Sequence, residues 1–187
     1  MKELVKKIAQ EFNIEFAALM AFIEVESGGK GFDQTTGKLI IQFEPAWFKR
    51  KAPISPPGIW SQNKVERQGA EWIAFEDAYR INPNAAMEST SIGLGQVMGF
   101  NYKRLGYPSV AAMWNDAKKG VERQIWQMAK FIVTDPRLIN ALRTKNWHLV
   151  AIYYNGAGYR ELAARIGREP YDISLEKAYR KYQLITR

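Results

Sequence analysis

Two carboxyl side chains stand where acid–base chemistry would need them. Glu26 follows Phe22 by four residues, at the margin of the apolar stripe of a predicted helix. Partial burial there should raise the pKa of the carboxyl and keep it protonated near neutral pH. Ser27-Gly28-Gly29 come next and should end the helix, which leaves the carboxyl at the edge of an opening. A protonated carboxyl in that position can act as a general acid.

Glu44 is the second carboxyl group, and it closes the β-rich run 38–43 directly before Pro45. Cleavage of a glycosidic bond commonly uses two carboxyl groups, one to protonate the leaving oxygen and one to activate water or stabilise the cationic transition state. Glu44 fits the second role. A carboxylate that merely favours the N-terminus of the helix beginning at Pro45 explains the same position. Glu24 should point about 200° away from Glu26 around the helix, as a solvated surface charge.

Glycines cluster in a third segment, Ser89 to Asn101. Gly93, Gly95 and Gly99 let the backbone approach a neighbour closely, and Gln96 carries an amide that can bond sugar hydroxyl or N-acetyl groups. The segment is not a phosphate loop, because it has no Walker lysine, its glycine spacing does not match a dinucleotide motif, and we predict no strand before it. Tight packing through small residues explains the glycines equally well.

A fourth segment, residues 153–158, should end a helix. Either Gly156 or Gly158 can be the left-handed terminator. Tyr154 and Asn155 would then face a groove with an aromatic platform and an amide. An ordinary helix stop also explains this segment when it is taken alone.

The elements that position these residues are mostly helical. Leu4, Ile8 and Phe12 recur at helical spacing, Asn13 is the predicted N-cap of the next helix, and similar spacing continues to residue 154. Turn residues 34–37 separate two short extended runs and predict one small β-hairpin. Residues 53–58 form a predicted surface loop, and Asp135 and Asn146 are predicted helix caps. These features predict a mainly α fold of α+β type.

The composition excludes several classes of protein. The 187 residues predict one domain, without room for a second module of ordinary size. The absence of Cys excludes disulfides, thiol nucleophiles and Cys-ligated zinc, and His148 alone cannot form a multi-His metal site. We therefore expect no metal and no cofactor. A Ser-His-Asp triad would have to use His148.

The N-terminal residues predict where the protein is made, and the net charge predicts what kind of partner it binds. Residues 1–10 have no apolar core of a signal peptide, and no window reaches 18 consecutive apolar residues, so we expect synthesis in a cytoplasm. The net charge of +8 favours an anionic partner: nucleic acid, an anionic membrane or a bacterial cell wall. The count alone does not choose among them.

Taken together, these segments resemble the lysozyme-like superfamily, and more closely the N-acetylmuramidase domain of bacteriophage endolysins and prophage proteins. The resemblance runs nearly the whole chain and is most specific at Gln96–Tyr102. Its other carriers are Ala21–Phe32, Ile41–Glu44, Ala85-Ala86 with Ser89–Gly93, Gly106-Tyr107, Asn146-Trp147 and Tyr154–Gly156. The resemblance implies a helical lysozyme-like domain whose small hairpin lines the substrate cleft.

The resemblance also implies a function. Glu26 becomes the catalytic acid of an enzyme that hydrolyses the β-1,4 bond between N-acetylmuramic acid and N-acetylglucosamine in peptidoglycan, and Glu44 its candidate partner. The candidate substrate-binding residues are Ser27, Ser91, Gln96, Asn101, Tyr154 and Asn155. We expect one monomeric catalytic domain over residues 1–187, without a separate wall-binding module or stable protein partner. Such an enzyme accumulates in the host cytoplasm and lyses the cell after another protein breaches the membrane.

The sequence departs from the family pattern at two places. The family usually follows the hairpin Glu with Arg-His, whereas Pro45-Ala46 follow Glu44 here, and it usually has Trp where Ile92 stands. These differences bear on substrate contacts more than on Glu26. The stretch 159–169 is longer than expected for the family, and we assign it no function.

Soluble lytic transglycosylases are a close alternative. Glu26-Ser27, Gly93–Gln96 and Tyr154-Asn155 also look like their three signature segments. These enzymes break the same bond without water and leave an anhydro sugar, with a single Glu serving as acid and then base. The stretch between Glu26 and Gly93 is long for that family, and a hairpin Glu fits hydrolysis better, so we favour the muramidase.

Two further classes are less favoured. A nucleic-acid-binding domain should concentrate Lys and Arg on one face, whereas here they alternate with acids, as in Glu66-Arg67 and Glu122-Arg123. The segment from Ser174 to Arg187 has a basic amphipathic pattern that can rest on anionic lipid. A terminal helix that packs on the core with its charges outward explains that pattern better.

Overall fold

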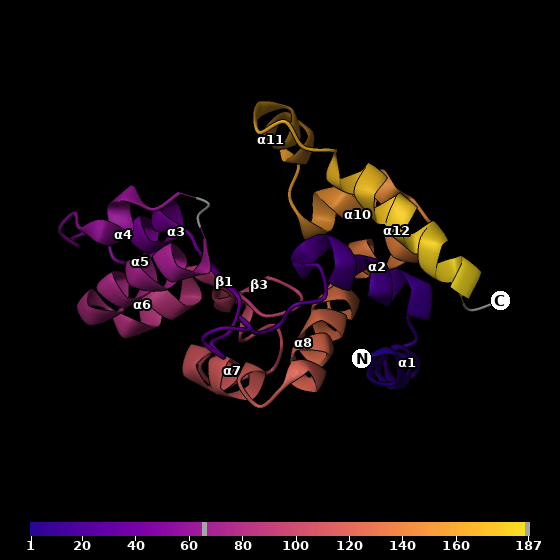
Figure 1. Ribbon diagram of the computed structural model, residues 1–187, viewed down its shortest axis with the longest axis horizontal. Helices are drawn as coiled ribbons and strands as arrows, with labels where there is room; N and C mark the ends of the chain where they lie inside the picture. Colours follow the sequence, from indigo (N-terminus) through magenta and orange to yellow (C-terminus); the bar gives the residue numbers. More distant parts are fainter. Residues whose placement is uncertain (65–66, 186–187) are drawn as a thin grey trace. The chain divides into compact units, whose positions relative to one another are not determined.

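A computed structural model describes residues 1–64 and 67–185 of the chain, so Glu66 and Arg187 lie outside the described residues. The described chain is mainly helical, with a small antiparallel sheet, as predicted (Figure 1). The fold divides into two compact units: Met1–Gly29 together with Met128–Arg187, and Lys30–Gln127. We call these the helical unit and the sheet unit. Helix α8 (Val121–Val133) belongs partly to each.

The helical unit is built around α2. Its other helices are α1 (Lys2–Glu11), α9 (Pro136–Arg143), α10 (Trp147–Tyr154), α11 (Tyr159–Arg165) and α12 (Tyr171–Ile185). Helix α2 (Phe16–Ser27) buries every residue from Ala17 to Ile23. A helix that is apolar all round must be covered on several sides. Helices α1 and α12 both pack against α2, and α12, the yellow helix of Figure 1, also packs against α10.

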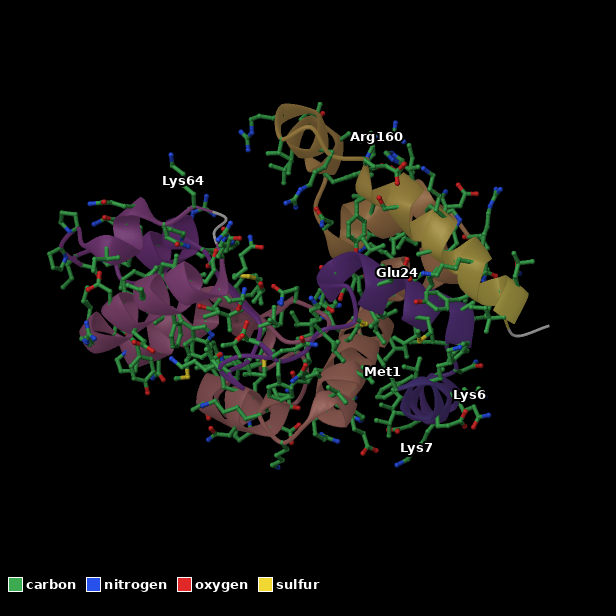
Figure 2. The ribbon with its side chains drawn as sticks, viewed as in Figure 1. Met1, Lys6, Lys7, Glu24, Lys64 and Arg160 are labelled. Atoms are coloured by element: carbon green, nitrogen blue, oxygen red, sulfur yellow. The ribbon has the colours of Figure 1, made fainter. Side chains whose placement is uncertain are left out.

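The C-terminal helix belongs to the core of this unit. Leu175 is 0% exposed and Tyr179 is 7% exposed. Lys181 and the Tyr182 hydroxyl each bond Glu24 at 2.6 Å, where α12 meets α2 (Figure 2). Glu24 is a partly exposed charge, as predicted, and the structure adds that Lys181 of α12 pairs with it. The interpretation of α12 as a terminal helix packed on the core is confirmed.

Three predicted caps can be compared with the structure. Asn13 is not the N-cap of α2, because Glu15 holds that place. Asn13 instead adopts a left-handed conformation with φ of 51° in the turn after α1, a conformation that Asn tolerates better than most residues. Asp135 and Asn146 are confirmed as the caps of α9 and α10, since each side chain accepts hydrogen bonds from backbone N–H groups of the first turn.

The sheet unit contains three short strands and several helices, of which α5 packs against β1 and α6 against β2. The strands are β1 (Ile41–Phe43), β2 (Thr90–Ile92) and β3 (Val97–Met98). The helices are α3 (Pro45–Lys51), α4 (Ile59–Gln62), α5 (Gln68–Ile81), α6 (Pro83–Glu88) and α7 (Val110–Ala117), with a 3-10 turn η1 at Gly99–Asn101. The order is β1-β2-β3, and both pairings are antiparallel. Ile92 pairs with Ile41 on one side and with Val97 on the other.

The hairpin prediction was right about the turn and wrong about the strand. A tight turn joins Phe32 to Leu39 through one isolated antiparallel bridge. The following strand β1 pairs with β2 and not with the segment before the turn. Strand β2 directly precedes Gly93, so the prediction that no strand precedes the glycines is also wrong. A three-residue strand buried on both faces shows no alternation by which a sequence would reveal it.

Helix α5 holds β1 in place. The Gln68 side chain bonds both the N–H and the C=O of Ile41, at 2.9 and 2.8 Å. Glu71, only 1% exposed, accepts the Phe43 N–H at 2.8 Å and the Asn63 amide at 3.1 Å. These bonds satisfy the edge of β1 that faces away from β2. The loop at 53–58 is confirmed, and no described helix is long and apolar enough to cross a membrane.

Candidate active site

Glu26 lies in the last turn of α2, where the predicted stop ends the helix. Gly28 is the left-handed terminator, with φ of 58°, and its N–H bonds the Glu24 carbonyl. The Ser27 hydroxyl donates to the Ile23 carbonyl at 3.1 Å. The Ser27 side chain thus bonds backbone within the last turn of α2. The predicted helix stop directly after Glu26 is therefore confirmed.

Burial and one tyrosine set the protonation of Glu26. Burial raises the pKa of the carboxyl to about 7, and a hydrogen bond from the Tyr171 hydroxyl to Glu26 Oε1 opposes that rise. Burial and the nearby carboxyl hold the pKa of Tyr171 well above its ordinary value, so this hydroxyl keeps its proton and donates. A large fraction of Glu26 is therefore protonated at neutral pH, as a general acid requires.

Aromatic rings support this pair. The Tyr154 ring lies 4.6 Å from the Phe22 ring between centroids, and 5.2 Å from the Phe131 ring in an edge-on contact. The Tyr171 ring is nearly parallel to it, at 6.3 Å and 13°. Tyr154 thus belongs to the aromatic layer that carries Tyr171 and, through it, Glu26. Asn155, the next residue and the C-cap of α10, is exposed.

Sequence reasoning missed Tyr171. This residue begins α12, two residues after the end of the stretch 159–169 to which no function was assigned. It lies 145 residues from Glu26 along the chain, so no local pattern connects the two. Pro170-Tyr171 before an amphipathic segment signals only that a helix begins.

Glu44 lies in the sheet unit. It is the N-cap residue of α3, but its side chain makes no capping bond. Its Oε1 accepts a hydrogen bond from the Gln42 amide at 2.8 Å instead. Burial raises the pKa of Glu44, the Gln42 bond lowers it, and the negative charge of Glu71 raises it. The capping interpretation therefore does not describe what this carboxyl binds.

Ser91 and Gln96 shape the turn between β2 and β3. The Ser91 hydroxyl donates to Gln96 Oε1 at 2.8 Å, and the Gln96 amide donates to the Gly93 carbonyl at 2.8 Å. Gln96 has a φ of 46° and Gly93 a φ of 69°. The Asn101 amide donates to the Met98 carbonyl at 3.2 Å. These three polar side chains hold the turn and its continuation in one shape.

Small-residue packing explains two of the three glycines. A Cβ on Gly93 would lie 2.8 Å from Gln124 Oε1, and one on Gly99 would lie 2.0 Å from the Met87 carbonyl oxygen. Gln124 Oε1 also accepts the Leu94 N–H at 3.0 Å. The glycines therefore admit a buried glutamine and a neighbouring backbone.

The predicted residues fall into two clusters. The helical unit holds Glu26, Ser27, Tyr154 and Asn155, and the sheet unit holds Glu44, Ser91, Gln96 and Asn101. His148 lies in the helical unit, and its Nδ1 lies 2.6 Å from the Tyr159 hydroxyl, which is a phenol and not a serine nucleophile. Among the described residues, no group of three or more His, Cys, Asp and Glu side chains could hold a metal ion.

Comparison with known proteins points to one family. The N-acetylmuramidase family model matches residues 15–183, which include parts of both units. The crystal structure of the Burkholderia AP3 phage endolysin is similar, with a TM-score of 0.83 and 29% identity over 100% of this chain and 72% of that one. No curated protein sequence matches. The match of this family model over most of the chain, together with a half-buried Glu of raised pKa at a helix end, identifies the protein as a glycoside hydrolase that belongs to the N-acetylmuramidase family.

Proposed function

We propose that this enzyme hydrolyses the β-1,4 bond between N-acetylmuramic acid and N-acetylglucosamine in peptidoglycan, with Glu26 as the acid. The observation that supports this most directly is the Glu26 carboxyl at the end of α2, with a pKa raised to about 7 and the Tyr171 hydroxyl bonded to it. A carboxyl that holds its proton near neutral pH can give it to a leaving oxygen.

The proposed reaction starts with proton transfer. Glu26 gives its proton to the glycosidic oxygen while the bond from that oxygen to the anomeric carbon breaks. In hydrolysis, the oxygen of a water molecule then bonds to the anomeric carbon. One proton of that water goes to the Glu26 carboxylate, which restores the acid. Glu44 would orient the water or offset positive charge at the anomeric carbon, as one of the carboxyl pair that most glycosidases use.

The substrate contacts form part of the same proposal. Asn155 is exposed at the end of α10 and offers its amide to a sugar. Gln96, Ser91 and Asn101 would act mainly through the shape of the turn they hold, since their side chains bond one another or the backbone. Ser27 and Tyr154 would act by fixing the end of α2 and the aromatic layer around Glu26.

We further propose that the enzyme is a monomer that acts on the host cell wall after the membrane has been breached. Its positive charge of +8 supports attraction to an anionic envelope. We do not propose nucleic acid as a ligand, because neither Glu26 nor Glu44 would have a role in binding it.

Anhydro-forming cleavage is the second candidate, and the environment of Glu44 favours it. Burial and the charge of Glu71 raise the pKa of Glu44, which weakens its use as an ionised partner in hydrolysis. In the alternative route the C6 hydroxyl of the muramic acid attacks its own anomeric carbon, and the hydroxyl proton goes to Glu26. That route needs one carboxyl group only.

Mass spectrometry of the products separates the two routes. Purified sacculi would be digested in oxygen-18-labelled water and the muropeptides weighed. Hydrolysis predicts reducing ends that carry one labelled oxygen. Anhydro ends, lighter by one water and without label, would replace hydrolysis by the second candidate.

Glu26→Gln tests the acid. The variant keeps the shape of the side chain and loses the proton that is donated, so we expect turnover of sacculi to fall by about 10²- to 10⁴-fold. Glu24→Gln is the matched control on the same helix, because the Glu24 carboxylate pairs with Lys181 and does not contact Tyr171. Its activity should stay within about twofold of that of the unmodified enzyme. A folded Glu26→Gln variant that clears sacculi at the normal rate would remove Glu26 from the mechanism.

A further inference from the structure

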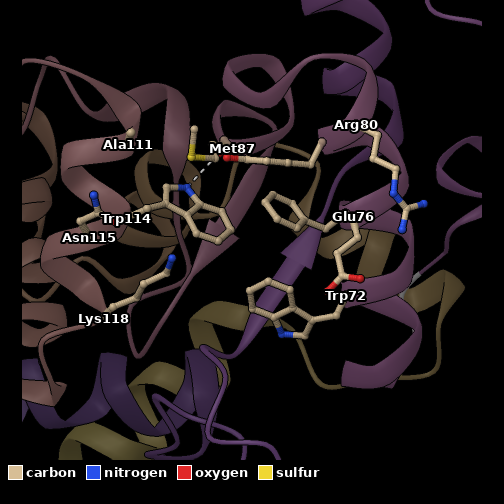
Figure 3. A pocket seen from close by; sticks show the side chains of 10 residues that line it. Trp72, Glu76, Arg80, Met87, Ala111, Trp114, Asn115 and Lys118 are labelled. Carbon is tan, nitrogen blue, oxygen red and sulfur yellow. Dashed lines mark hydrogen bonds between the residues drawn. The ribbon is translucent and has the colours of Figure 1, made fainter.

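A cavity of about 440 Å³ opens in the sheet unit between α5, α6 and α7 (Figure 3). Its volume falls in the range of about 300 to 1,000 Å³ that small-molecule sites occupy. None of the residues that line it is among the predicted site residues, and neither Glu26 nor Glu44 takes part. The cavity is therefore not explained by the catalytic proposal.

Aromatic rings form its apolar part, and other contacts hold them in place. Phe75 stacks on Trp114 at 4.8 Å and 18°, and both rings are almost fully buried. Trp72 stands edge-on to both, at 5.4 Å from Phe75 and 6.3 Å from Trp114. The Trp72 indole N–H bonds the Leu39 carbonyl at 3.0 Å, and the Trp114 indole N–H bonds the Met87 carbonyl at 3.2 Å. The rings need little rearrangement to receive a ligand.

Charged side chains surround the rings. Arg80 on α5 and Lys118 beyond α7 lie on opposite sides of the cavity in Figure 3. Glu76, the one acidic lining residue, is already paired with Lys38 at 2.9 Å. Within the described part of the chain, Arg80 and Lys118 form neither an ion pair nor a side-chain hydrogen bond. The lining thus has a cationic side chain on each of two opposite sides of the apolar rings.

We propose that this cavity binds a muramyl peptide, with the apolar side of the N-acetylated sugar against Trp72 and Tyr79 and the peptide carboxylates at Arg80 and Lys118. Tyr79 is 41% exposed and offers its ring at the rim. A neutral glycan would leave both cations unused, whereas the stem peptide of peptidoglycan carries carboxylates, which guanidinium and ammonium groups bind. The inference takes peptidoglycan as the ligand source from the proposed function.

The direct test uses a ligand without a glycosidic bond, N-acetylmuramyl-L-alanyl-D-glutamate, so the enzyme cannot cut it. Nitrogen-15 labelling of the full chain makes the indole N–H groups of its six tryptophans visible by NMR. Titration at physiological salt should shift the Trp72 and Trp114 signals in a saturable way. Trp60, whose indole bonds the Pro56 carbonyl and which does not line the cavity, is the internal reference. Unmoved Trp72 and Trp114 signals at 20 mM ligand would overturn the proposal.

Variants separate carboxylate recognition from contact with the rings alone. The double variant Arg80→Glu with Lys118→Glu should bind the ligand about five- to tenfold more weakly, as the loss of two exposed charge pairs implies. Lys2→Glu with Arg165→Glu changes the net charge equally at exposed positions of the helical unit and should bind as the unmodified chain does. Equal affinity in the Arg80 and Lys118 double variant, or equal affinity of N-acetylglucosamine alone, would overturn the proposal.

Failure of this inference and failure of the proposed function give different results. If sacculi are cut and Glu26→Gln stops the cutting while the two indole signals stay still, the cavity inference alone is wrong. Suppose instead that the indole signals shift and the Arg80→Glu, Lys118→Glu double variant binds more weakly, but no glycosidic bond is cut. The proposed function is then wrong, and the cavity still binds its ligand.

Discussion

The protonation of Glu26 is the residue-scale property on which the proposed chemistry depends. The carboxyl is held between burial, which raises its pKa, and the Tyr171 hydroxyl, which lowers it. The local sequence predicted the burial, because a Glu at the margin of an apolar stripe cannot face bulk water freely. It did not predict the tyrosine, whose hydrogen bond opposes the rise in pKa that burial causes.

The pH profile of Tyr171→Phe should reveal this balance. Activity that needs protonated Glu26 falls as pH rises through about 7. Removal of the phenol removes a bond that lowers the pKa, so the alkaline limb should move to higher pH, together with a lower kcat from a less well positioned acid. Tyr182→Phe loses a bond to Glu24 on the same two helices and should leave the limb in place. An unchanged limb in Tyr171→Phe would show that the phenol has no influence on the acid.

The free energy of unfolding should depend on pH through the same raised pKa of Glu26. The unfolded carboxyl loses its proton above pH 4.5, while the folded one keeps it up to about 7, so the free energy of unfolding falls as pH rises between these values. The full shift corresponds to about 3 kcal/mol. Glu26→Gln cannot ionise and should be the more stable protein above pH 7, with little difference below pH 4.5. Urea unfolding at several pH values measures this, and parallel curves for the two proteins would contradict it.

At the scale of elements, β1 depends on side chains from α5 because it is only three residues long. Its length is too short for sheet pairing alone to hold it. Gln68 and Glu71 bond its backbone on the side away from β2, and Glu44 follows at its end. The position of the second carboxyl is therefore a consequence of helix α5, which no pattern near residue 44 indicates.

Glu71→Ala should destabilise the fold by about 1 to 3 kcal/mol, because it leaves the buried Phe43 N–H without an acceptor. Glu71→Gln retains one acceptor oxygen and should lose less. Glu3→Ala, at a side chain that is 84% exposed, provides the matched control with no large effect. Chemical unfolding monitored by tryptophan fluorescence measures all three. Equal stability of Glu71→Ala and Glu3→Ala would show that the bond to β1 is dispensable.

At the scale of the whole molecule, the net charge of +8 attracts anionic polymers, and this attraction is the sum over many residues. Exposed lysines such as Lys6, Lys7 and Lys64 extend from different segments (Figure 2). A charge spread in this way acts over a Debye length, about 10 Å at 0.1 M salt. It favours adsorption to an anionic polymer without specifying a site.

Adsorption of the Glu26→Gln variant to purified sacculi should therefore weaken several-fold between about 50 and 500 mM NaCl. Sedimentation of the sacculi and measurement of the unbound protein provide the result. Adsorption that is independent of salt would show that the net charge contributes nothing to targeting.

The sequence by itself determined what depends on neighbouring residues. The mainly helical fold, the stop at Gly28 after Glu26, and the caps at Asp135 and Asn146 follow from apolar spacing and from side chains that bond backbone within one turn. The resemblance to the N-acetylmuramidase family rested on the same local segments, and the family match over residues 15–183 confirmed it.

Only the tertiary structure decided which distant residues meet. Tyr171 reaches Glu26 across 145 residues, and Ser91 on β2 reaches the Gln42 carbonyl across 49. The aromatic cavity assembles from three helices, each of which shows only ordinary apolar spacing. Such contacts are selected by packing and burial of the whole chain, because the free energy that favours them comes from surfaces that touch only after folding.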